Sequence, residues 1–506
     1  MNTILSPSLI FCISLIIHFF CIKYLSPIYA LDKPDHRKLH SKTTSQIGGL
    51  LFGAIFITVC SLLSILPLWF MVGGIVTILL GVIDDNFSIS WYFKLMVQLL
   101  LVAFLSYIFW ERFQFILFYG YTLPISQLTL LIVFSIWFVG IYNAVNLIDG
   151  LDGLAGGFML LLCLGLGLSG SGSFATLNLM LSVILIGFLV FNQRPAKLFM
   201  GDAGSLLLGF HVAVLPLLFL ENATAVPSLN MTTFVLLVSY LVADTTRVFF
   251  TRLAAKKSPM TADTIHFHHL ILQKSGSYLS SIGSIFFITL ISVIGAVFSF
   301  HLELSTNMML VHLALLLLFI LTPPVQTYVP IITKAIGPIY NWQKGSQKTS
   351  PFLFRTIFMA ALLIGLIFSL SFYCNLCIIT WQHGLAVILL FIFIFFYRKD
   401  KMAKYVIQLG LVLFFAELYW NTELGIITKL FTIFLLISYL VFTLEKRFGC
   451  NISKFSTLDL LLILITLGGV TLALLGFPVS IWFFLTMFSL WFGSSFLLHR
   501  TIYFFS

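Results

Sequence analysis

Carboxylates and amides gather where two apolar stretches of the chain end. The first stretch ends in Gly81-Val-Ile-Asp84-Asp85-Asn86. Asp84 and Asp85 would lie at a helix C-terminus, whose partial negative charge disfavours each carboxylate by up to about 1 kcal/mol. A divalent cation would offset this repulsion and keep both groups ionised. A hydrated helix end is the plain alternative for this pair.

The second stretch ends in Asn143-Ala-Val-Asn146-Leu-Ile-Asp149-Gly-Leu-Asp152, with an oxygen-bearing side chain at every third position. These side chains would line one helical face as far as Asp149, and Asp152 would continue it if the helix persists through Gly150. Mg²⁺ takes oxygen ligands and usually keeps water and substrate phosphate in its shell. We therefore expect a Mg²⁺ site here, with Mn²⁺ as a substitute.

A third polar segment, Asn192-Gln-Arg-Pro-Ala-Lys-Leu-Phe199-Met-Gly-Asp202, leads into another apolar stretch. Asp202 stands at the expected helix start, where the carboxylate could hold a metal ion or the helix N-terminus could receive phosphate. A plain N-cap is the alternative role for Asp202. Phe199 could stack on a nucleotide base.

Basic and histidine side chains mark two further loops. They are Arg37, Lys38 and His40 in the first loop, and Asp244, Arg247, His266, His268 and His269 in the second. The first loop offers donors suited to phosphate oxygens, with membrane anchoring by positive charge as the alternative. In the second loop, basic and oxygen-rich surroundings favour phosphate or sugar contacts over a transition-metal site, which stays an alternative.

Together the five loops carry the groups that phosphoryl transfer needs. These groups are carboxylates for a metal that spans the phosphates, cations that clamp them, and a carboxylate that accepts a proton. Because the loops connect apolar stretches, we expect one of the two substrates to be a membrane lipid.

The composition identifies the elements that must position these loops. The 506-residue chain is 60% hydrophobic and only 9% charged, and its mean hydropathy is +1.10. So few charges cannot cover a water-facing surface of this size, which excludes a soluble enzyme, a disordered scaffold and a disulfide-stapled secreted domain. The net charge of +10 reflects Lys and Arg kept on the cytoplasmic side, and we expect no nucleic-acid partner.

Apolar runs of roughly 20 residues recur along the chain, enough for a helix to cross about 30 Å of hydrocarbon. We expect an all-α polytopic membrane protein with a bundle of about 11 transmembrane helices and about 6 additional C-terminal ones. The first set is expected near 3–29, 47–66, 68–83, 95–110, 127–146, 154–170, 174–191, 204–220, 228–249, 279–300 and 303–322. The second set is expected near 355–374, 376–397, 402–418, 424–444, 457–475 and 478–498.

The distribution of charge predicts the orientation in the membrane. With the N-terminus outside and the C-terminus inside, 25 of the 27 basic residues fall in inner loops, and only Arg112 and Lys429 fall outside. All eleven Asp lie at or near inner loops as well. Chemistry built on these carboxylates would therefore face the cytoplasm.

A polar interruption at 326–353 predicts a linker between two modules. Residues 1–325 carry every candidate site, whereas 354–506 contain almost no intramembrane ionisable residue apart from His383. The second module is expected to be a helical bundle without chemistry of its own. Cys374 and Cys377 form a CxxC at a predicted outer turn, where either a disulfide or two unpaired cysteines would fit.

The ordered motifs RKLH…GG, GVIDD, NAVNLIDGLDGLAGG, FMGDAGS, DTTRV and SPMTADTIHFHH resemble those of the polyprenyl-phosphate N-acetylhexosamine-1-phosphate transferases. The resemblance covers residues 1 to about 325. The run HFHHLIL is more similar to the WecA and TagO branch, which starts O-antigen, common-antigen or teichoic-acid chains, than to the muramyl-pentapeptide branch with three consecutive histidines. Two departures are Ser45-Gln46, where relatives usually have prolines, and the module 354–506, which exceeds the usual length.

The resemblance implies an eleven-helix enzyme of the bacterial plasma membrane. Such an enzyme transfers a sugar 1-phosphate, expected here to be GlcNAc-1-phosphate, from a UDP-N-acetylhexosamine to undecaprenyl phosphate and releases UMP at a cytoplasmic Mg²⁺ site. Asp84 and Asp85 match the essential pair, one of them being the base toward the lipid phosphate. The sugar, the choice between direct attack and a covalent intermediate, and the formation of a homodimer stay open.

The expected roles form three sets. The catalytic set is Asp84, Asp85, His268 and Lys38; the substrate-binding set is Asn143, Asp149, Asp152, Asn192, Phe199, Arg247, His266 and His269; and the metal-binding set is Asn146, Asp202 and Asp84. In the resemblance, Phe199 matches a position on the uracil face, Lys38 a basic residue at the mouth of the cleft, and the histidines a motif near phosphate or sugar.

Two other classes of protein are alternatives. A lipid or polysaccharide transporter or flippase would suit the number of spans, although its ionisable groups should run along a pathway and not gather at one face. A CDP-alcohol phosphotransferase would suit Asp149-Gly150 and Asp152-Gly153, although the Arg expected shortly afterwards is absent. Release of UMP or of CMP would distinguish the latter.

Overall fold

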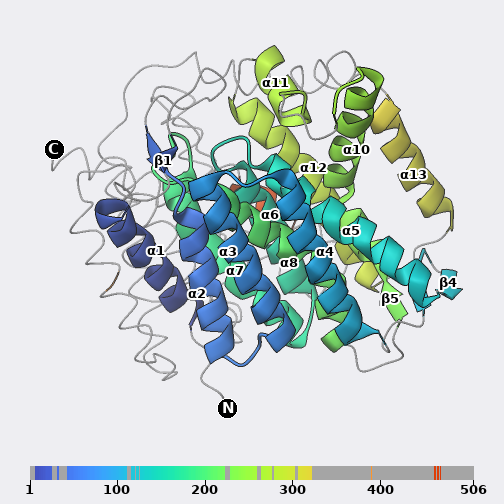
Figure 1. Cartoon of the computed structure of the whole chain (residues 1–506), viewed down its shortest axis with the longest axis horizontal. Helices are drawn as coiled ribbons and strands as arrows, with labels where there is room; N and C mark the ends of the chain where they lie inside the picture. Colours follow the sequence, from blue (N-terminus) through green and yellow to red (C-terminus); the bar gives the residue numbers. More distant parts are fainter. Residues whose placement is uncertain are drawn as a thin grey trace, which may run out of the picture. The chain divides into compact units, whose positions relative to one another are not determined.

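The structure is a computed structural model, and its described part is mostly helical (Figure 1). It describes residues 6–25, 31–32, 43–110, 115–119, 121–124, 126–222, 228–258, 264–275, 278–301 and 306–321, with scattered positions between 389 and 468. The chain divides into two compact units, residues 18–335 and a second unit formed by 1–17 with 336–506. The expected linker 326–353 and nearly all of the expected module 354–506, with its CxxC, lie outside the described residues.

The described residues form thirteen helices. In chain order they are α1 (Pro7–Tyr24), α2 (Gly48–Leu62), α3 (Leu68–Phe87), α4 (Trp91–Phe109), α5 (Gln127–Ile148), α6 (Leu154–Ser169), α7 (Gly172–Asn192), α8 (Gly201–Asn222), α9 (Met231–Leu237), α10 (Ser239–Ala254), α11 (Phe267–Ser275), α12 (Tyr278–His301) and α13 (Thr306–Leu321).

Within the described part of the chain, seven helices are long and apolar enough to cross a membrane. They are α1, α3, α4, α7, α8, α12 and residues Leu131–Ile148 of α5. The pair α9 and α10 would be an eighth span, bent by 66° at its break, and α2, α6 and part of α13 are shorter apolar helices. The chain is therefore a multi-pass membrane protein, and a helix overlaps each of the eleven spans expected in 1–325. The count of 11 plus 6 transmembrane helices stays a prediction.

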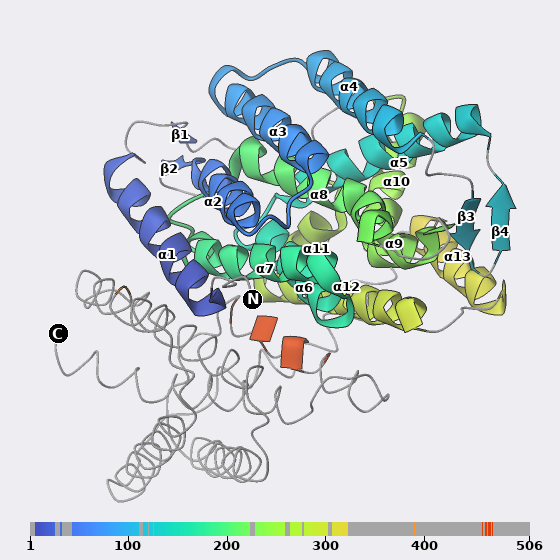
Figure 2. The same cartoon turned by 90° about the horizontal axis from the view of Figure 1, so that it is seen from below.

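The expectation of a wholly helical fold misses five short strands. They are β1 (Leu31–Asp32), β2 (Thr44–Ser45), β3 (Phe115–Phe118), β4 (Tyr121–Pro124) and β5 (Ser228–Asn230). The first two pair antiparallel, and the other three form a sheet of order β4-β3-β5 beside α9 (Figure 2). Aromatic and β-branched residues in the loops favour such local pairing. Helix α11 (Phe267–Ser275) also differs from the expectation, since the sequence predicts a loop there.

Helix α8 is the central element of the unit 18–335. In its apolar stretch 94% of the residues are buried, against 33% in α4 and in α5. A Cβ added at Gly49 would lie 2.1 Å from the Gly204 nitrogen, and one added at Gly81 would lie 2.3 Å from the Ala203 backbone. Small residues let transmembrane helices approach this closely and gain packing contacts that lipid would not give. The start of α8 is therefore fixed against α2 and α3.

A tight turn joins α3 to α4. Ser88 adopts a left-handed conformation (φ 48°), and its N–H donates to the Asp84 carbonyl at 2.9 Å, which ends α3. Two residues later, the Ser90 hydroxyl accepts the Phe93 N–H at 3.4 Å and so caps α4. Because only three residues separate the two helices, the first turn of α4 lies beside the last turn of α3.

Candidate active site

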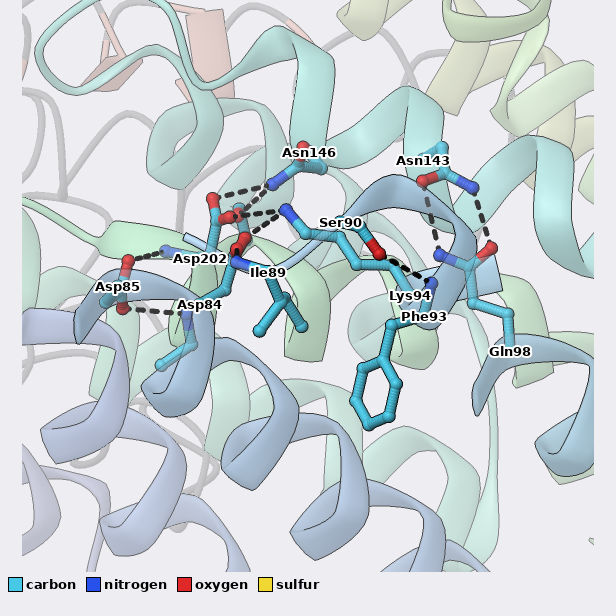
Figure 3. A network of polar contacts seen from close by, with 12 residues as sticks. Asp84, Asp85, Ile89, Ser90, Phe93, Lys94, Gln98, Asn143, Asn146 and Asp202 are labelled. Carbon is cyan, nitrogen blue, oxygen red and sulfur yellow. Dashed lines mark hydrogen bonds and ion pairs between the residues drawn. The ribbon is translucent and has the colours of Figure 1, made fainter. Parts of the chain in front are cut away.

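Four helix ends bring charged and amide side chains together in what we call the carboxylate cluster: Asp84, Lys94, Asn146 and Asp202 (Figure 3). The Lys94 ammonium pairs with the Asp84 carboxylate and lies 3.1 Å from Asp202 Oδ2. Asn146 Nδ2 donates to Asp202 Oδ1 at 3.1 Å and to the Ser205 hydroxyl at 2.7 Å. The three residues of the expected metal-binding set thus lie in one network.

The cluster opens to solvent on one side. The Asp84 side chain is only 6% exposed, whereas that of Asp202 is 33% exposed. A dissolved ion or phosphate could therefore reach the cluster at Asp202, with Asp84 behind it.

Asp85 has a different role from its neighbour Asp84. Its two carboxylate oxygens accept the Asp202 N–H at 2.7 Å and the Ala203 N–H at 3.2 Å, so Asp85 caps the N-terminus of α8 from another helix. Asp84 instead accepts the Ile89 N–H at 2.9 Å and pairs with Lys94. The positive end of α8 and the lysine thus offset the charge repulsion expected at the end of α3. Asp202 lies within the first turn of α8 and does not cap it.

The polar residues expected to line one face of the fifth span, from Asn143 to Asp152, do not form one continuous helical face. Asn143 forms a reciprocal amide pair with Gln98 of α4, at 2.9 and 3.2 Å, and lies apart from the carboxylate cluster (Figure 3). Helix α5 ends at Ile148, and Asp149 follows in a non-helical conformation with ψ 48°. Positions three apart also drift around a helix of 3.6 residues per turn, so Asn146 reaches Asp202 but Asn143 does not.

The loop after α5 is tied to the loop before α8. The Asn192 side chain accepts the Gly153 N–H at 2.9 Å and donates to the Leu198 carbonyl at 2.8 Å. Asp152 Oδ2 accepts the Ala196 N–H at 3.3 Å. Gly153 has φ +75°, a conformation that glycine adopts without strain. Asn192 and Asp152, both expected to bind substrate, therefore also hold this pair of loops together.

Asp149 lies in the loop after α5 and is repelled electrostatically by several other carboxylates. Loss of hydration raises the pKa of Asp149 to about 7, and the charges of Asp202, Asp152 and Asp85 act in the same direction. This local excess of negative charge makes the site receptive to a cation.

A second group, which we call the histidine cluster, consists of Asp244, Arg247, His266, His268 and His269. The buried Asp244 carboxylate accepts hydrogen bonds from His266 Nδ1 at 2.9 Å, Arg247 Nη2 at 2.7 Å and the Phe267 N–H at 3.1 Å. It thereby caps α11, the short helix that carries His268 and His269. Arg247, expected to contact substrate, also donates to the Ile265 carbonyl at 2.7 Å and is buried.

The histidine rings pack on each other and against the loop after α5. His266 and His268 stack with centroids 5.9 Å apart, and burial lowers the pKa of His268 well below its usual value, so its ring is neutral. A Cβ added at Gly150 would lie 2.7 Å from His268 Nε2 and 3.0 Å from His269 Nε2. Gly150 thus permits close contact between the loop and the histidine cluster.

Among the described residues, no three His, Cys, Asp or Glu side chains are grouped so as to hold a metal ion. Within that part of the chain, the His266, His268 and His269 rings are accordingly not arranged as a set of metal ligands. A divalent ion at Asp84 and Asp202 would need further ligands from an amide, water or substrate.

Two expected residues remain. The Phe199 N–H donates to the Ser45 carbonyl at 2.9 Å, and the Phe199 carbonyl accepts the Gly48 N–H at 3.0 Å. Backbone pairing thus fixes the loop in which Ser45-Gln46 replaces the usual prolines. Lys38 lies outside the described residues.

Comparison with known proteins decides the family. The model of glycosyl transferase family 4 matches residues 67–220, which include the whole carboxylate cluster. The chain is 33% identical over 293 residues to a Bacillus subtilis protein named as a probable undecaprenyl-phosphate N-acetylglucosaminyl 1-phosphate transferase, covering 53% of this chain and 77% of that protein. The chain belongs to glycosyl transferase family 4.

Two further relatives each match about half of the chain. Undecaprenyl-phosphate alpha-N-acetylglucosaminyl 1-phosphate transferase of Thermotoga maritima is 31% identical over 288 residues, covering 55% of this chain and 87% of that protein. The Escherichia coli K12 protein of the same name is 26% identical over 289 residues, covering 52% of this chain and 75% of that protein. These matches confirm the resemblance and do not favour a transporter.

Sequence reasoning missed one residue of this family 4 site. By charge distribution alone, Lys94 is only one of the basic residues of the inner loops, yet its ammonium lies between two carboxylates. The signal that could have found it is the segment Ser88-Ile-Ser90, whose two serines suit a helix end and a helix start and so predict a tight turn.

Proposed function

We propose that this protein transfers GlcNAc-1-phosphate from UDP-GlcNAc to undecaprenyl phosphate and releases UMP, as the first membrane step of a cell-surface polysaccharide. The observation that carries the proposal is the carboxylate cluster, in a chain whose relatives are named for this transfer. In the reaction, a phosphate oxygen of the lipid forms a bond to the sugar-bearing phosphorus, and the bond from that phosphorus to the UMP oxygen breaks.

The donor set of the cluster suits Mg²⁺, with Mn²⁺ as a substitute. Asp84 and Asp202 already converge on a cation, the Lys94 ammonium. Mg²⁺ is commonly bound by one or two carboxylates, with waters and substrate phosphates as the other ligands. We infer that Asp84, Asp202 and the Asn146 amide would hold this ion. When bound, it would offset the negative charge of the two substrates' phosphates.

Each residue of the cluster then has a distinct part. Asp84, the less exposed carboxylate, is the base that removes a proton from the lipid phosphate. Lys94 supplies a cation that draws phosphate oxygens toward Asp202. Asp85 keeps the start of α8 in place through its two backbone contacts and takes no part in proton transfer.

The charge distribution supports the location of the reaction. Since 25 of 27 basic residues fall in the loops predicted to be inner, we infer a multi-pass protein of the bacterial plasma membrane with its site at the cytoplasmic face. The N-terminus would be outside and the C-terminus inside. The transferase module would be 1–325, followed by the linker 326–353 and the extension 354–506.

The test uses the full-length protein purified in detergent, with undecaprenyl phosphate, Mg²⁺ and a panel of UDP-sugars, and mass spectrometry of the products. We expect UMP release that requires both the lipid and the metal, with UDP-GlcNAc as the preferred donor. Equal UMP release without lipid would contradict the proposal. Transfer from a CDP-alcohol with CMP as product would support the phosphotransferase alternative.

A further inference from the structure

The first turn of α12 holds two segments of the site by their backbone. The Tyr278 hydroxyl donates a hydrogen bond to the Asp152 carbonyl, and the Ser281 hydroxyl donates to the His268 carbonyl at 2.6 Å. Tyr278 and Ser281 are three residues apart and so lie on one face of the helix. One helix face therefore sets the spacing between the loop after α5 and the histidine cluster.

Tyr278 also contacts a third segment, the loop before α8. The Arg194 guanidinium lies 4.3 Å from the centroid of the Tyr278 ring, within the range of a cation–π contact. The same loop donates the Ala196 N–H to Asp152 Oδ2 at 3.3 Å. Asp152 is thus held through its carbonyl by Tyr278 and through its carboxylate by the loop that Tyr278 contacts.

The chemistry of Tyr278 suits a permanent donor. Burial, with the neighbouring Asp152 charge, raises the pKa of Tyr278, so the phenol keeps its proton throughout the physiological range. A hydroxyl that never ionises and accepts no reacting proton can orient a backbone carbonyl but cannot act as the base of the reaction.

We propose that Tyr278 is a positioning residue for the nucleotide of the sugar donor, acting by holding the Asp152 loop against the loop that contains Arg194. The inference rests on the proposed function and on the expected substrate-binding roles of Asp152 and Phe199 in these two loops, Phe199 on the uracil face. In the described part of the chain, Tyr278 contacts Asp152 and Arg194 but forms no hydrogen bond with Asp84 or Asp202, so we expect it to affect donor binding and not the chemical step.

The test compares three variants of the full-length protein. Tyr278→Phe removes the hydroxyl and keeps the ring beneath Arg194, and Arg194→Gln removes the cation and keeps the hydroxyl. Tyr119→Phe is the matched control, because its phenol is bonded to His312 Nδ1 at 2.5 Å in a separate network. KM for UDP-GlcNAc, KM for undecaprenyl phosphate, kcat and the calorimetric affinity for UMP are measured for each.

We expect Tyr278→Phe to raise KM for UDP-GlcNAc and weaken UMP binding about fivefold, the effect of losing one neutral hydrogen bond. Its kcat and its KM for the lipid should stay within about twofold of wild type. Arg194→Gln should act in the same direction, and the double variant should lose less than the two single effects combined, since both act on one pair of loops.

Two results would overturn the inference. One is an unchanged KM for UDP-GlcNAc together with unchanged UMP affinity in Tyr278→Phe. The other is a loss of kcat and of affinity for UDP-GlcNAc, the lipid and UMP alike that Tyr119→Phe reproduces, which would show a general loss of stability. If the wild type bound UMP but released none from UDP-GlcNAc, the proposed function would fail while the calorimetric comparison still tested Tyr278.

Discussion

The carboxylate cluster and the histidine cluster differ in their balance of charge. In the first, Asp84 and Asp202 share the single ammonium of Lys94, and further carboxylates lie nearby. In the second, Asp244 is matched by Arg247, and His268 is neutral. The first region therefore keeps an excess of negative charge that can bind a cation. In the second region the charges neutralise each other, and the buried carboxylate positions the histidine rings.

Both regions use the same structural device. A carboxylate from one helix caps the N-terminus of another: Asp85 caps α8, and Asp244 caps α11. The capped helices carry Asp202 and His268, respectively. The capping carboxylates thus fix the helices that carry Asp202 and His268, and neither Asp202 nor His268 acts as a cap. Substitution of a capping residue can therefore test stability separately from activity.

The largest effect is expected from the carboxylates that share Lys94. Asp84→Asn and Asp202→Asn should each lower kcat about 10³-fold, because transition-state stabilisation of about 4 kcal/mol is lost. The rate of UMP release measures this, and membrane insertion should be unchanged. Glu221→Gln is the control: it lies at the other end of α8, where its carboxylate accepts the Trp69 indole N–H. Normal turnover in both Asp variants would remove the cluster from the mechanism.

The next effect concerns the internally balanced region. Asp244→Ala leaves the buried Arg247 without its carboxylate and should lower the free energy of unfolding by about 3 kcal/mol. Thermal unfolding in detergent, followed by circular dichroism, measures the loss. The double variant Asp244→Leu with Arg247→Met should recover much of it, since no buried charge remains. Equal instability of the single and double variants would argue against this charge balance.

A smaller effect should separate Asp85 from Asp84. Asp85→Ala removes the cap of α8 and should lower the free energy of unfolding by about 1 kcal/mol, whereas Asp85→Asn retains a capping oxygen and should lose less. Thermal unfolding and UMP release are compared for both. Asp85→Asn with wild-type stability but the activity of Asp84→Asn would instead show that Asp85 takes part in the reaction.

The smallest effect is expected at the amide pair outside both clusters. A double-mutant cycle of Gln98→Ala and Asn143→Ala should give a coupling energy of about 0.6 kcal/mol, typical of interhelical hydrogen bonds in membranes. Thermal unfolding provides the free energies. KM for UDP-GlcNAc should not change, and a large rise in that KM would support the expected substrate-binding role of Asn143.

The length of the apolar runs was enough to predict where the membrane-spanning helices lie along the sequence, because such a helix must span the hydrocarbon whatever its neighbours are. Contacts between distant residues could not be inferred in this way. Asp85 caps a helix 117 residues further along the chain, and no local pattern reports that contact. Lys94 was missed for a similar reason, since a lysine after an inner turn is also what membrane orientation alone would produce. Helix α11 was missed because its nine residues have no long apolar run.

The glycine contacts of α8 have a consequence for the choice of acceptor. Backbone meets backbone at Gly49 and Gly81, so these two helix contacts contain no side chains that could rearrange. The apolar surface that is open to a lipid tail lies elsewhere, on α4 and α5, whose apolar stretches are only 33% buried. Tail preference could thus diverge through substitutions there while the phosphate chemistry stays the same.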